Sequence, residues 1–260
     1  MMPEVRSGLP LFGSDLDMHH MKDAVPPVVI LAHGQPSDPA RAAAELAGFA
    51  AQVAEHLPDR RVLAATLAQA GALAEAAAVA GAGGEVFPLF MAGGWFTRIH
   101  IPKRLADAGA VGWRVLEPFG CDPALHDLAA TIVAEALPSP SAQVLVAAHG
   151  SSKSPAPANI AHHVAKVIRA KTALSRVEAA FIEQAPTLAS VQGYDVESLC
   201  LPFFAAAGGH VNDDIPAALA QAGFRGKILP PLGLDRRAPE LVAAAIRRGQ
   251  PICATGCRHG

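Results

Sequence analysis

The fold is indicated by a short, mostly apolar stretch, QVLVAAHG at residues 143–150. It resembles an earlier stretch, VVILAHG at residues 28–34. Each copy is an unbroken apolar run that ends in His-Gly. A run that is apolar on both faces is typical of a strand buried inside a parallel sheet. Six further runs alternate with alanine-rich amphipathic segments, and together they predict an α/β fold. We expect strands at 28–34, 61–67, 85–91, 113–120, 143–150, 176–183, 198–204 and 227–233.

The predicted strands form two sets of four, which indicates an internal duplication. VLAATLAQAGALAE matches VEAAFIEQAPTLAS, FPLFMAGGW matches LPFFAAAGGH, and RVLEPFGCD matches KILPPLGLD. The offset between matched residues changes only from 116 to 113 along the chain, so the repeat is a duplicated domain and not a solenoid. We predict an N-terminal extension (1–26), an N-terminal half (27–137), a C-terminal half (142–250) and a tail containing cysteine and histidine (251–260).

Composition excludes several classes of protein. The chain has 260 residues, of which 51% are hydrophobic and 17% charged, and this argues against disorder. A net charge of −2 argues against a large nucleic-acid footprint, and no uncharged run is long enough to cross a membrane. The N-terminus lacks the pattern of a secretory signal, and the four cysteines do not resemble a disulfide framework. We expect a soluble, cytoplasmic monomer or homodimer with no nucleic-acid or membrane partner.

Three residues suited to metal or proton chemistry lie at predicted strand ends of the C-terminal half: His149, Glu183 and His210. Because the C-terminal ends of parallel strands share one edge of a sheet, these side chains can converge there. Two neutral imidazoles and a carboxylate suit a borderline divalent cation such as Fe, Co, Ni or Zn. Three ligands leave coordination positions open, which favours a cation that is handed over above one locked in structurally.

Each of these residues, taken alone, also has a structural interpretation. His210 follows Gly-Gly and could hydrogen-bond across its loop, His149 could be a turn residue, and Glu183 could stabilise a helix N-terminus. The N-terminal half offers a comparison, because only one of its matching positions is polar. These positions are His33, Ala68 and Trp95. Loss of two polar groups together indicates a site abandoned in one half after duplication and retained in the other.

The chain beyond the second histidine predicts the start of a helix. We interpret Asp213 and Asp214 as N-cap residues ahead of a proline. The matching N-terminal stretch, GGWFTRIHIP at 93–102, has one residue more between its glycine pair and its proline, which puts His100 two residues before that proline. Trp95 could form an aromatic wall for a flat ligand or plug the former site, and the sequence leaves both interpretations open.

A resemblance to a known family rests on VLVAAHGSSKSP, VEAAFIEQAPTL, LCLPFFAAAGGHVNDDIP and LPPLGLD. Together these stretches resemble the sirohydrochlorin chelatase family, the class II chelatases of cobalamin and sirohaem biosynthesis, in its two-domain form. The resemblance covers residues 28 to about 245 and implies two flavodoxin-like halves in a chelatase fold. It also implies that two histidines and a glutamate act on the metal and on the pyrrole protons. In this sequence they are His149, His210 and Glu183.

The activity that the resemblance implies is insertion of a divalent metal, cobalt, iron or nickel, into sirohydrochlorin. The metal is a substrate in this reaction, and no organic cofactor is expected. The carboxylates of the tetrapyrrole need donors, which Ser151, Ser152 and Lys153 offer at a strand-to-helix turn. Gly208 and Gly209 would let the backbone approach the macrocycle. Further candidate cations in the other half are Arg98, Lys103 and Arg104.

Two other functions stay open at the level of the sequence. A non-catalytic metal- or tetrapyrrole-binding protein descended from a chelatase would use the same residues without turnover. A hydrolase could use His149 and Ser151, but the chain lacks a nucleophile elbow and an acid partner. Near the C-terminus, Cys253, Cys257 and His259 could hold a metal or an iron–sulfur cluster, or belong to an incidental tail.

Overall fold

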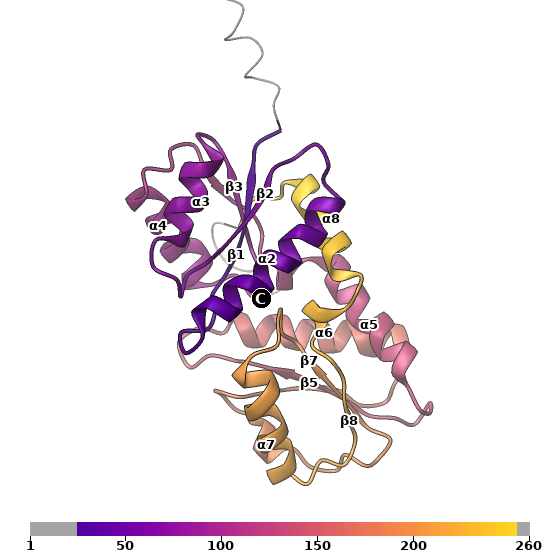
Figure 1. The fold of residues 1–260 in the computed structure, drawn as a ribbon. Coiled ribbons are helices and arrows are strands. Elements are labelled where there is room, and N and C mark those ends of the chain that lie inside the picture. Colours follow the sequence, from indigo (N-terminus) through magenta and orange to yellow (C-terminus); the bar gives the residue numbers. More distant parts are fainter. Residues whose placement is uncertain (1–24, 254–260) are drawn as a thin grey trace, which may run out of the picture.

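The computed structural model describes residues 25–253, which form two α/β halves, each built on one sheet (Figure 1). All paired strands are parallel, in the orders β2-β1-β3-β4 and β6-β5-β7-β8. The first sheet contains β1 (Val28–Ala32), β2 (Val62–Thr66), β3 (Glu85–Pro88) and β4 (Arg114–Val115). The second contains β5 (Val144–Ala148), β6 (Val177–Phe181), β7 (Leu199–Pro202) and β8 (Lys227–Ile228). The eight predicted strands and the predicted fold class are therefore confirmed.

Helices connect the strands and differ between the halves at one place. The first half contains α2 (Pro39–Glu55), α3 (Ala72–Ala80), α4 (Ile101–Asp107) and α5 (Pro123–Ala136), and the second contains α6 (Ala156–Thr172), α7 (Ile215–Gln221) and α8 (Ala238–Arg248). The short turns are η1 (Phe96–His100), η2 (Phe119–Cys121), η3 (Leu188–Ser190), η4 (His210–Asp214) and η5 (Leu232–Leu234). In the second half, η3 stands where the first half has α3. Within residues 25–253 no helix has the length and apolar character needed to cross a membrane.

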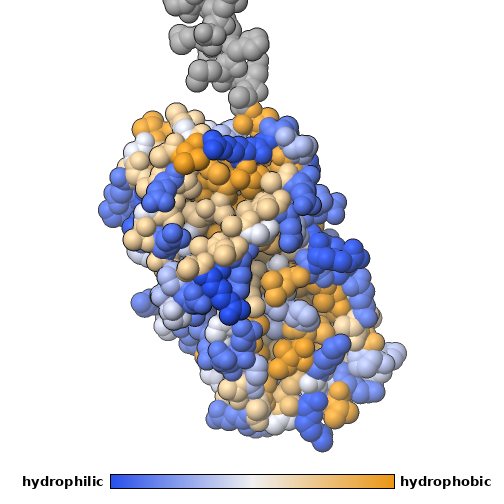
Figure 2. All heavy atoms as spheres, viewed as in Figure 1, coloured by the Kyte–Doolittle hydropathy of each residue, from blue (hydrophilic) through white to orange (hydrophobic). Residues whose placement is uncertain are grey.

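The central strands are buried because their side chains are apolar on both faces. Val28, Val29, Ile30 and Leu31 are fully shielded from solvent in β1, and every residue of β5 is buried. Helices α2 and α5 begin where an aspartate is followed directly by a proline in the sequence. Asp122 shows this at α5, where its Oδ1 accepts a 2.9 Å hydrogen bond from the backbone N–H of Ala124. The molecular face in Figure 2 mixes hydrophilic and hydrophobic residues.

The two halves exchange their last helices. Helix α5, which follows the first sheet, packs against α6 and β7 of the second half, whereas α8 packs against α2 of the first half. Helices α5 and α8 also contact each other. Because α5 corresponds to α8 and α2 to α6, these reciprocal contacts are those of an approximate two-fold arrangement. The boundary between the halves at residues 137–142 stays a prediction. In sequence α5 belongs to the first half and α8 to the second, but each packs against the opposite half.

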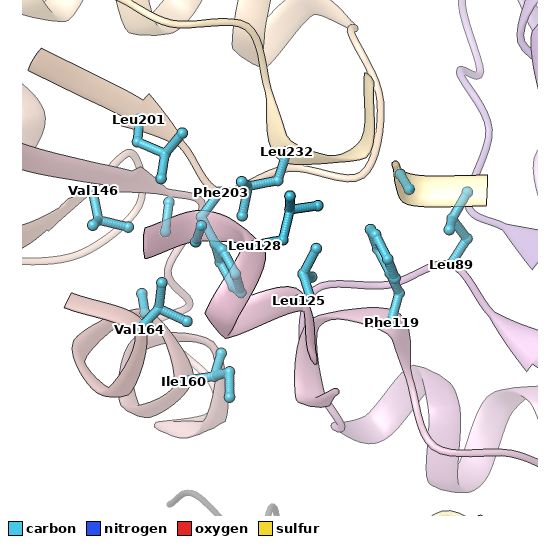
Figure 3. Close-up of a cluster of buried hydrophobic side chains, with 14 of the residues drawn as sticks. Leu89, Phe119, Leu125, Leu128, Val146, Ile160, Val164, Leu201, Phe203 and Leu232 are labelled. Atoms are coloured by element: carbon cyan, nitrogen blue, oxygen red, sulfur yellow. The ribbon is translucent and has the colours of Figure 1, made fainter. Parts of the chain in front are cut away.

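A single apolar core joins the halves through α5. Leu125 and Leu128 of this helix lie between the second sheet and the first half, as Figure 3 shows. Residues from both halves belong to this cluster, including Leu89, Phe119, Val146, Ile160, Val164, Leu201, Phe203 and Leu232. Because residues of both halves are buried in this one cluster, the packing of the core holds the two halves in place relative to each other.

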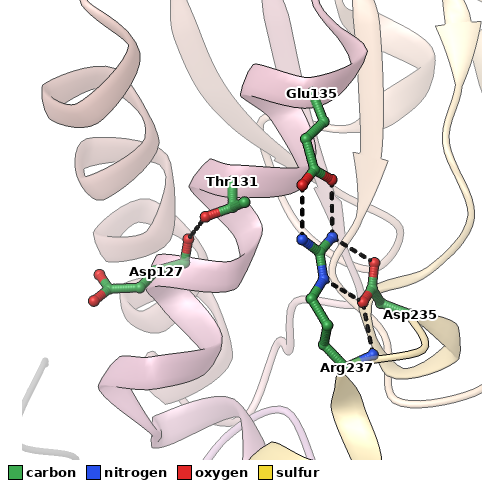
Figure 4. A network of polar contacts seen from close by, with 5 residues as sticks. All are labelled: Asp127, Thr131, Glu135, Asp235 and Arg237. Carbon is green, nitrogen blue, oxygen red and sulfur yellow. Dashed lines mark hydrogen bonds and ion pairs between the residues drawn. The ribbon is translucent and has the colours of Figure 1, made fainter.

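A polar network also fixes α5 to the segment ahead of α8 (Figure 4). Nη1 and Nη2 of Arg237 donate to the two carboxylate oxygens of Glu135 at 2.8 and 2.9 Å, and its Nε donates to Asp235 at 2.8 Å. The hydrogen bonds from Arg237 hold the pKa of Asp235 below its usual value. This planar, bidentate contact positions η5 and α8 relative to α5.

Candidate active site

The strand order places two candidate sites at equivalent positions. Each sheet reverses its strand order between its two central strands, β1 and β3 in the first half and β5 and β7 in the second. In open parallel sheets, ligands bind beyond the strand C-termini at such a reversal. His149 directly follows β5 and His210 begins η4 after β7, so both lie at the reversal of the second sheet.

A glycine turn directs His149 away from the end of its strand. Gly150 has φ of +74°, and a Cβ there would lie 2.7 Å from Cγ of Gln184, so a side chain at this position would be strained and would clash. The imidazole of His149 is 41% exposed and its Nδ1 lies 3.0 Å from the carbonyl oxygen of Gly150. Because that oxygen can only accept, this hydrogen bond requires the proton on Nδ1 and leaves Nε2 with a free lone pair.

Glu183 lies next to His149 on the adjacent strand connection. Its backbone N–H donates to the carbonyl oxygen of His149 at 3.0 Å, and its carboxylate Oε2 is 3.7 Å from Nδ1 of the same histidine. The side chain is half exposed. The residue lies in a bend between β6 and η3 with no helix beginning there, so its interpretation as a helix N-terminal carboxylate is wrong.

His210 completes the group. Its ring centroid is 4.7 Å from that of His149, with the two planes nearly perpendicular, and its Nδ1 lies 2.7 Å from Oδ2 of Asp214. The structure thus brings together the three residues that the sequence singled out. In the described part of the chain, no group of three His, Cys, Asp or Glu side chains is arranged to hold a metal ion.

Asp214 is a site residue that the sequence reasoning missed. Asp214 stands at the N-cap position of α7, as expected, but its side chain makes no capping hydrogen bond and instead accepts from Nδ1 of His210. A carboxylate on one ring nitrogen of a histidine fixes the tautomer and makes the other nitrogen a better base or ligand. The signal was present in the sequence as His-x-x-x-Asp, which places both side chains on one face of a helical turn.

Backbone N–H groups of the loop after β5 donate hydrogen bonds to side chains, which hold the loop in place. The N–H of Ser151 donates to Oε1 of Gln184 at 2.7 Å, and the N–H of Lys153 donates to Oγ of Ser151 at 3.1 Å. Ser152 and Lys153 are exposed. These three residues border His149 as expected, and their contacts with a substrate stay a prediction.

Gly208 and Gly209 have room for a side chain within the protein itself. A Cβ at Gly208 would come no closer than 3.8 Å to Gln35, and one at Gly209 would lie 3.7 Å from Asp213 and 3.8 Å from Gln35. These are ordinary van der Waals distances. Gln35 belongs to the loop after β1, so this glycine loop faces the first half across the junction.

The first half carries a different set of residues at its own reversal. The N–H of Ala68 donates to the carbonyl oxygen of His33 at 2.8 Å, which reproduces the contact between Glu183 and His149 and confirms this pair of counterparts. The pairing of Trp95 with His210 is wrong. Because η1 and η4 each span five residues ahead of their α-helices, Phe96 takes the place of His210.

His100 takes the place of Asp214 in the first half, so the equivalent site of this half has two histidines, His33 and His100, and not one. The ring of Phe96 lies 5.3 Å from that of His33 and 5.4 Å from that of His100. Burial lowers the pKa of His33, and the nearby imidazoles of His100 and His149 lower it further. His33 is therefore neutral at pH 7 and lies within electrostatic reach of the second half.

Of the three candidate metal ligands near the C-terminus, Cys253 lies within the described residues. Sγ of Cys253 lies 3.9 Å from Oε1 of Glu117, whereas Cys257 and His259 fall outside the described residues, as does most of the N-terminal extension. Cys121 and Cys200 are buried, and burial raises the pKa of the Cys200 thiol to about 12.

Two parallel-sheet halves with a His/Glu/His group at one reversal define the class of two-half chelatase-fold proteins. Comparison with known proteins agrees. The sequence model of the CbiX family matches residues 143–249. A solved structure described as CbiX, the terminal enzyme for biosynthesis of siroheme in denitrifying bacteria, is 42% identical, with a TM-score of 0.79, over 85% of this chain and 98% of that one. The chain belongs to the CbiX family.

More distant structures share the fold. SirB from Bacillus subtilis with Fe3+ is 17% identical, with a TM-score of 0.68 over 86% of this chain and 94% of that one. The sirohydrochlorin chelatase SirB from Bacillus subtilis subspecies spizizenii in complex with cobalt is 15% identical, with a TM-score of 0.67 and the same shares. No curated protein matched the chain in a sequence search.

Proposed function

We propose that this chain is a sirohydrochlorin metal chelatase, a lyase that inserts divalent cobalt or iron into the tetrapyrrole in cobalamin or sirohaem biosynthesis. The observation that carries the proposal is the pair of imidazoles of His149 and His210, 4.7 Å apart, with Glu183 beside them at the sheet reversal. Membership of the CbiX family, at 42% identity over nearly the whole of one relative, supplies the substrate class.

The reaction requires a metal ion to lose its bound water and a macrocycle to lose two pyrrole protons. Nδ1 of His149 is engaged by Gly150 and Nδ1 of His210 by Asp214, so each histidine can direct its Nε2 to the metal. Glu183 is half exposed and can accept a pyrrole proton as a general base. The metal is a substrate here, so an open ligand set that releases it suits the turnover.

The chemistry belongs to the second half. Phe96 and Ala68 occupy the places of His210 and Glu183 in the first half, and neither can bind a cation or accept a proton. In addition, Nε of Arg104 lies 3.4 Å from Nε2 of His100, which places a permanent positive charge beside this imidazole. A divalent ion would be repelled there.

The tetrapyrrole would lie between the halves. Ser151, Ser152 and Lys153 would bind its carboxylates beside His149, and Gly208 and Gly209 carry no side chain that would keep the macrocycle from their backbone. We also propose a cytoplasmic location, a monomer or homodimer, and the division of the chain at residues 137–142.

The test is anaerobic incubation of the protein with sirohydrochlorin and Co²⁺, Fe²⁺ or Ni²⁺ in turn, with the absorption spectrum of the macrocycle followed over time. His149→Ala and His210→Ala should each lower the initial rate by about a thousandfold, and Glu183→Ala by about a hundredfold. His56→Ala is the matched control, because His56 is exposed and distant from the site. Uptake of metal or tetrapyrrole without catalysed insertion would show a binding protein instead.

A further inference from the structure

We propose that Trp95 is a positioning residue for the tetrapyrrole: its indole forms an aromatic wall in the first half against which the macrocycle stacks, facing His149 and His210. This inference rests on the proposed function.

Trp95 is a large aromatic side chain that lies exposed on the surface and not in the core. Its relative exposure is 59%, and the nearby Ile99 and Phe96 are 55% and 38% exposed. Large apolar groups gathered on one turn usually mark a binding surface. The indole is nevertheless held in place, because it stacks on His100 at 5.1 Å with planes 29° apart and meets Phe96 edge-on at 5.2 Å.

The duplication gives the direction of the side chain. Trp95 precedes η1 with φ and ψ of −56° and −41°, and Gly209 precedes η4 with nearly the same values, −51° and −42°. A Cβ at Gly209 would lie 3.8 Å from Nε2 of Gln35, in the loop after β1 of the opposite half. Under the approximate two-fold arrangement, the equivalent of Gln35 is Ser151. The Cα–Cβ bond of Trp95 is therefore expected to point toward the Ser151 loop, which follows His149.

The electrostatic contact between the halves agrees with this direction. Phe96 contacts Trp95 on one side and His33 on the other, and the imidazole of His149 contributes to the lowered pKa of His33. His33, against which Phe96 packs, therefore lies within electrostatic reach of His149.

Cations around Trp95 match the rim of the substrate. Sirohydrochlorin is a flat conjugated ring system with carboxylates at its periphery, and an exposed indole with cations on the following helix complements both parts. Arg98 follows three residues later, and its Nε is buried with no hydrogen-bond partner among residues 25–253. Lys103 and Arg104 lie on the adjoining α4. Nε of Arg104 donates to His100, the residue on which Trp95 stacks, so the exposed indole and a cation lie close together and favour a flat ligand that carries carboxylates.

The structure also separates the two interpretations that the sequence left open. Phe96, and not Trp95, occupies the place of the lost ligand and packs on His33, so Phe96 is the plug. Trp95 lies one residue earlier, where the other half has only Gly209. The two sides of the junction are therefore unequal: a glycine loop on the metal side and an indole on the other.

The test uses metal-free sirohydrochlorin under anaerobic conditions, so that binding is measured without turnover. The chain has two tryptophans, and Trp113→Phe leaves Trp95 as the only one. We expect the emission of Trp95 to be quenched on titration, with the same Kd as the absorption change of the macrocycle. Trp95→Ala should raise that Kd about tenfold and Trp95→Phe less than about threefold, since phenylalanine retains a stacking surface.

Kinetics separate positioning from catalysis. For Co²⁺ insertion, Trp95→Ala should raise the KM for the tetrapyrrole about tenfold and change kcat by less than about threefold, whereas Val111→Ala, at an exposed valine of the same half, should change neither. Wild-type turnover together with an unaltered Kd in Trp95→Ala, or with unquenched Trp95 emission at saturation, would overturn this inference alone. A wild-type protein that neither binds nor metallates sirohydrochlorin would overturn the proposed function as well.

Discussion

Removal of the Asp214 carboxylate should reduce chelation while leaving the protein folded. Oδ2 of Asp214 is 2.7 Å from Nδ1 of His210, and this hydrogen bond fixes which ring nitrogen is free for the metal. Loss of such a partner typically costs 10- to 100-fold in metal affinity or activity. We therefore expect Asp214→Ala to lower kcat/KM by about 10- to 100-fold, or about 1.4–2.7 kcal/mol of transition-state stabilisation.

The same geometry predicts a small effect on stability. The side chains of His210 and Asp214 are 47% and 52% exposed, and the two residues lie four positions apart on one turn. Exposed pairs of this spacing contribute about 0.3–0.5 kcal/mol, which corresponds to a shift in Tm of about 1–2 °C. Asp214→Asn, which retains an acceptor at nearly the same place, should lose less activity than Asp214→Ala.

The assay is the anaerobic initial rate of Co²⁺ insertion, with circular dichroism and thermal unfolding on the same samples. Asp213→Ala is the matched control, because Asp213 is the adjacent, exposed carboxylate on the same turn. Full activity of Asp214→Ala, or an equal loss in both variants, would refute the argument that this one hydrogen bond orients His210.

Two further predictions concern stability. Leu125→Ala should lower the free energy of unfolding by about 3 kcal/mol, since Leu125 is fully buried on the helix that joins the halves. Leu234→Ala, at a leucine that is 56% exposed, should have little effect. Urea denaturation measures both variants, and equal losses of stability would contradict the shared core. His33→Gln should make stability less sensitive to acid, because a histidine with a lowered folded pKa binds its proton more readily when unfolded, so wild-type stability falls as the pH drops through and below about 6.5. Unfolding midpoints at several pH values from 7.5 to 5 would test this, and parallel curves for the two proteins would exclude His33 as the source.

The sequence by itself determined the fold class and the three central residues. Strands that are buried on both faces need long apolar runs, and a parallel sheet needs helices between them, so both features are visible as composition along the chain. The duplication was readable because related residues recur in order. His149, Glu183 and His210 were found because parallel strands bring the residues that follow them to one edge, whatever the rest of the chain does.

Tertiary structure decided the details that depend on register and on contacts between distant segments. One additional residue in the first half shifted the alignment, and only the matching turns η1 and η4 showed that Phe96 and His100 stand opposite His210 and Asp214. The exchange of α5 and α8 could not be seen in sequence, because an amphipathic helix specifies an apolar face and not the sheet that covers it. The role of Asp214 was hidden for a similar reason: an aspartate before a helix can cap the backbone or bind a side chain one turn earlier, and the position of His210 settles which acceptor it becomes.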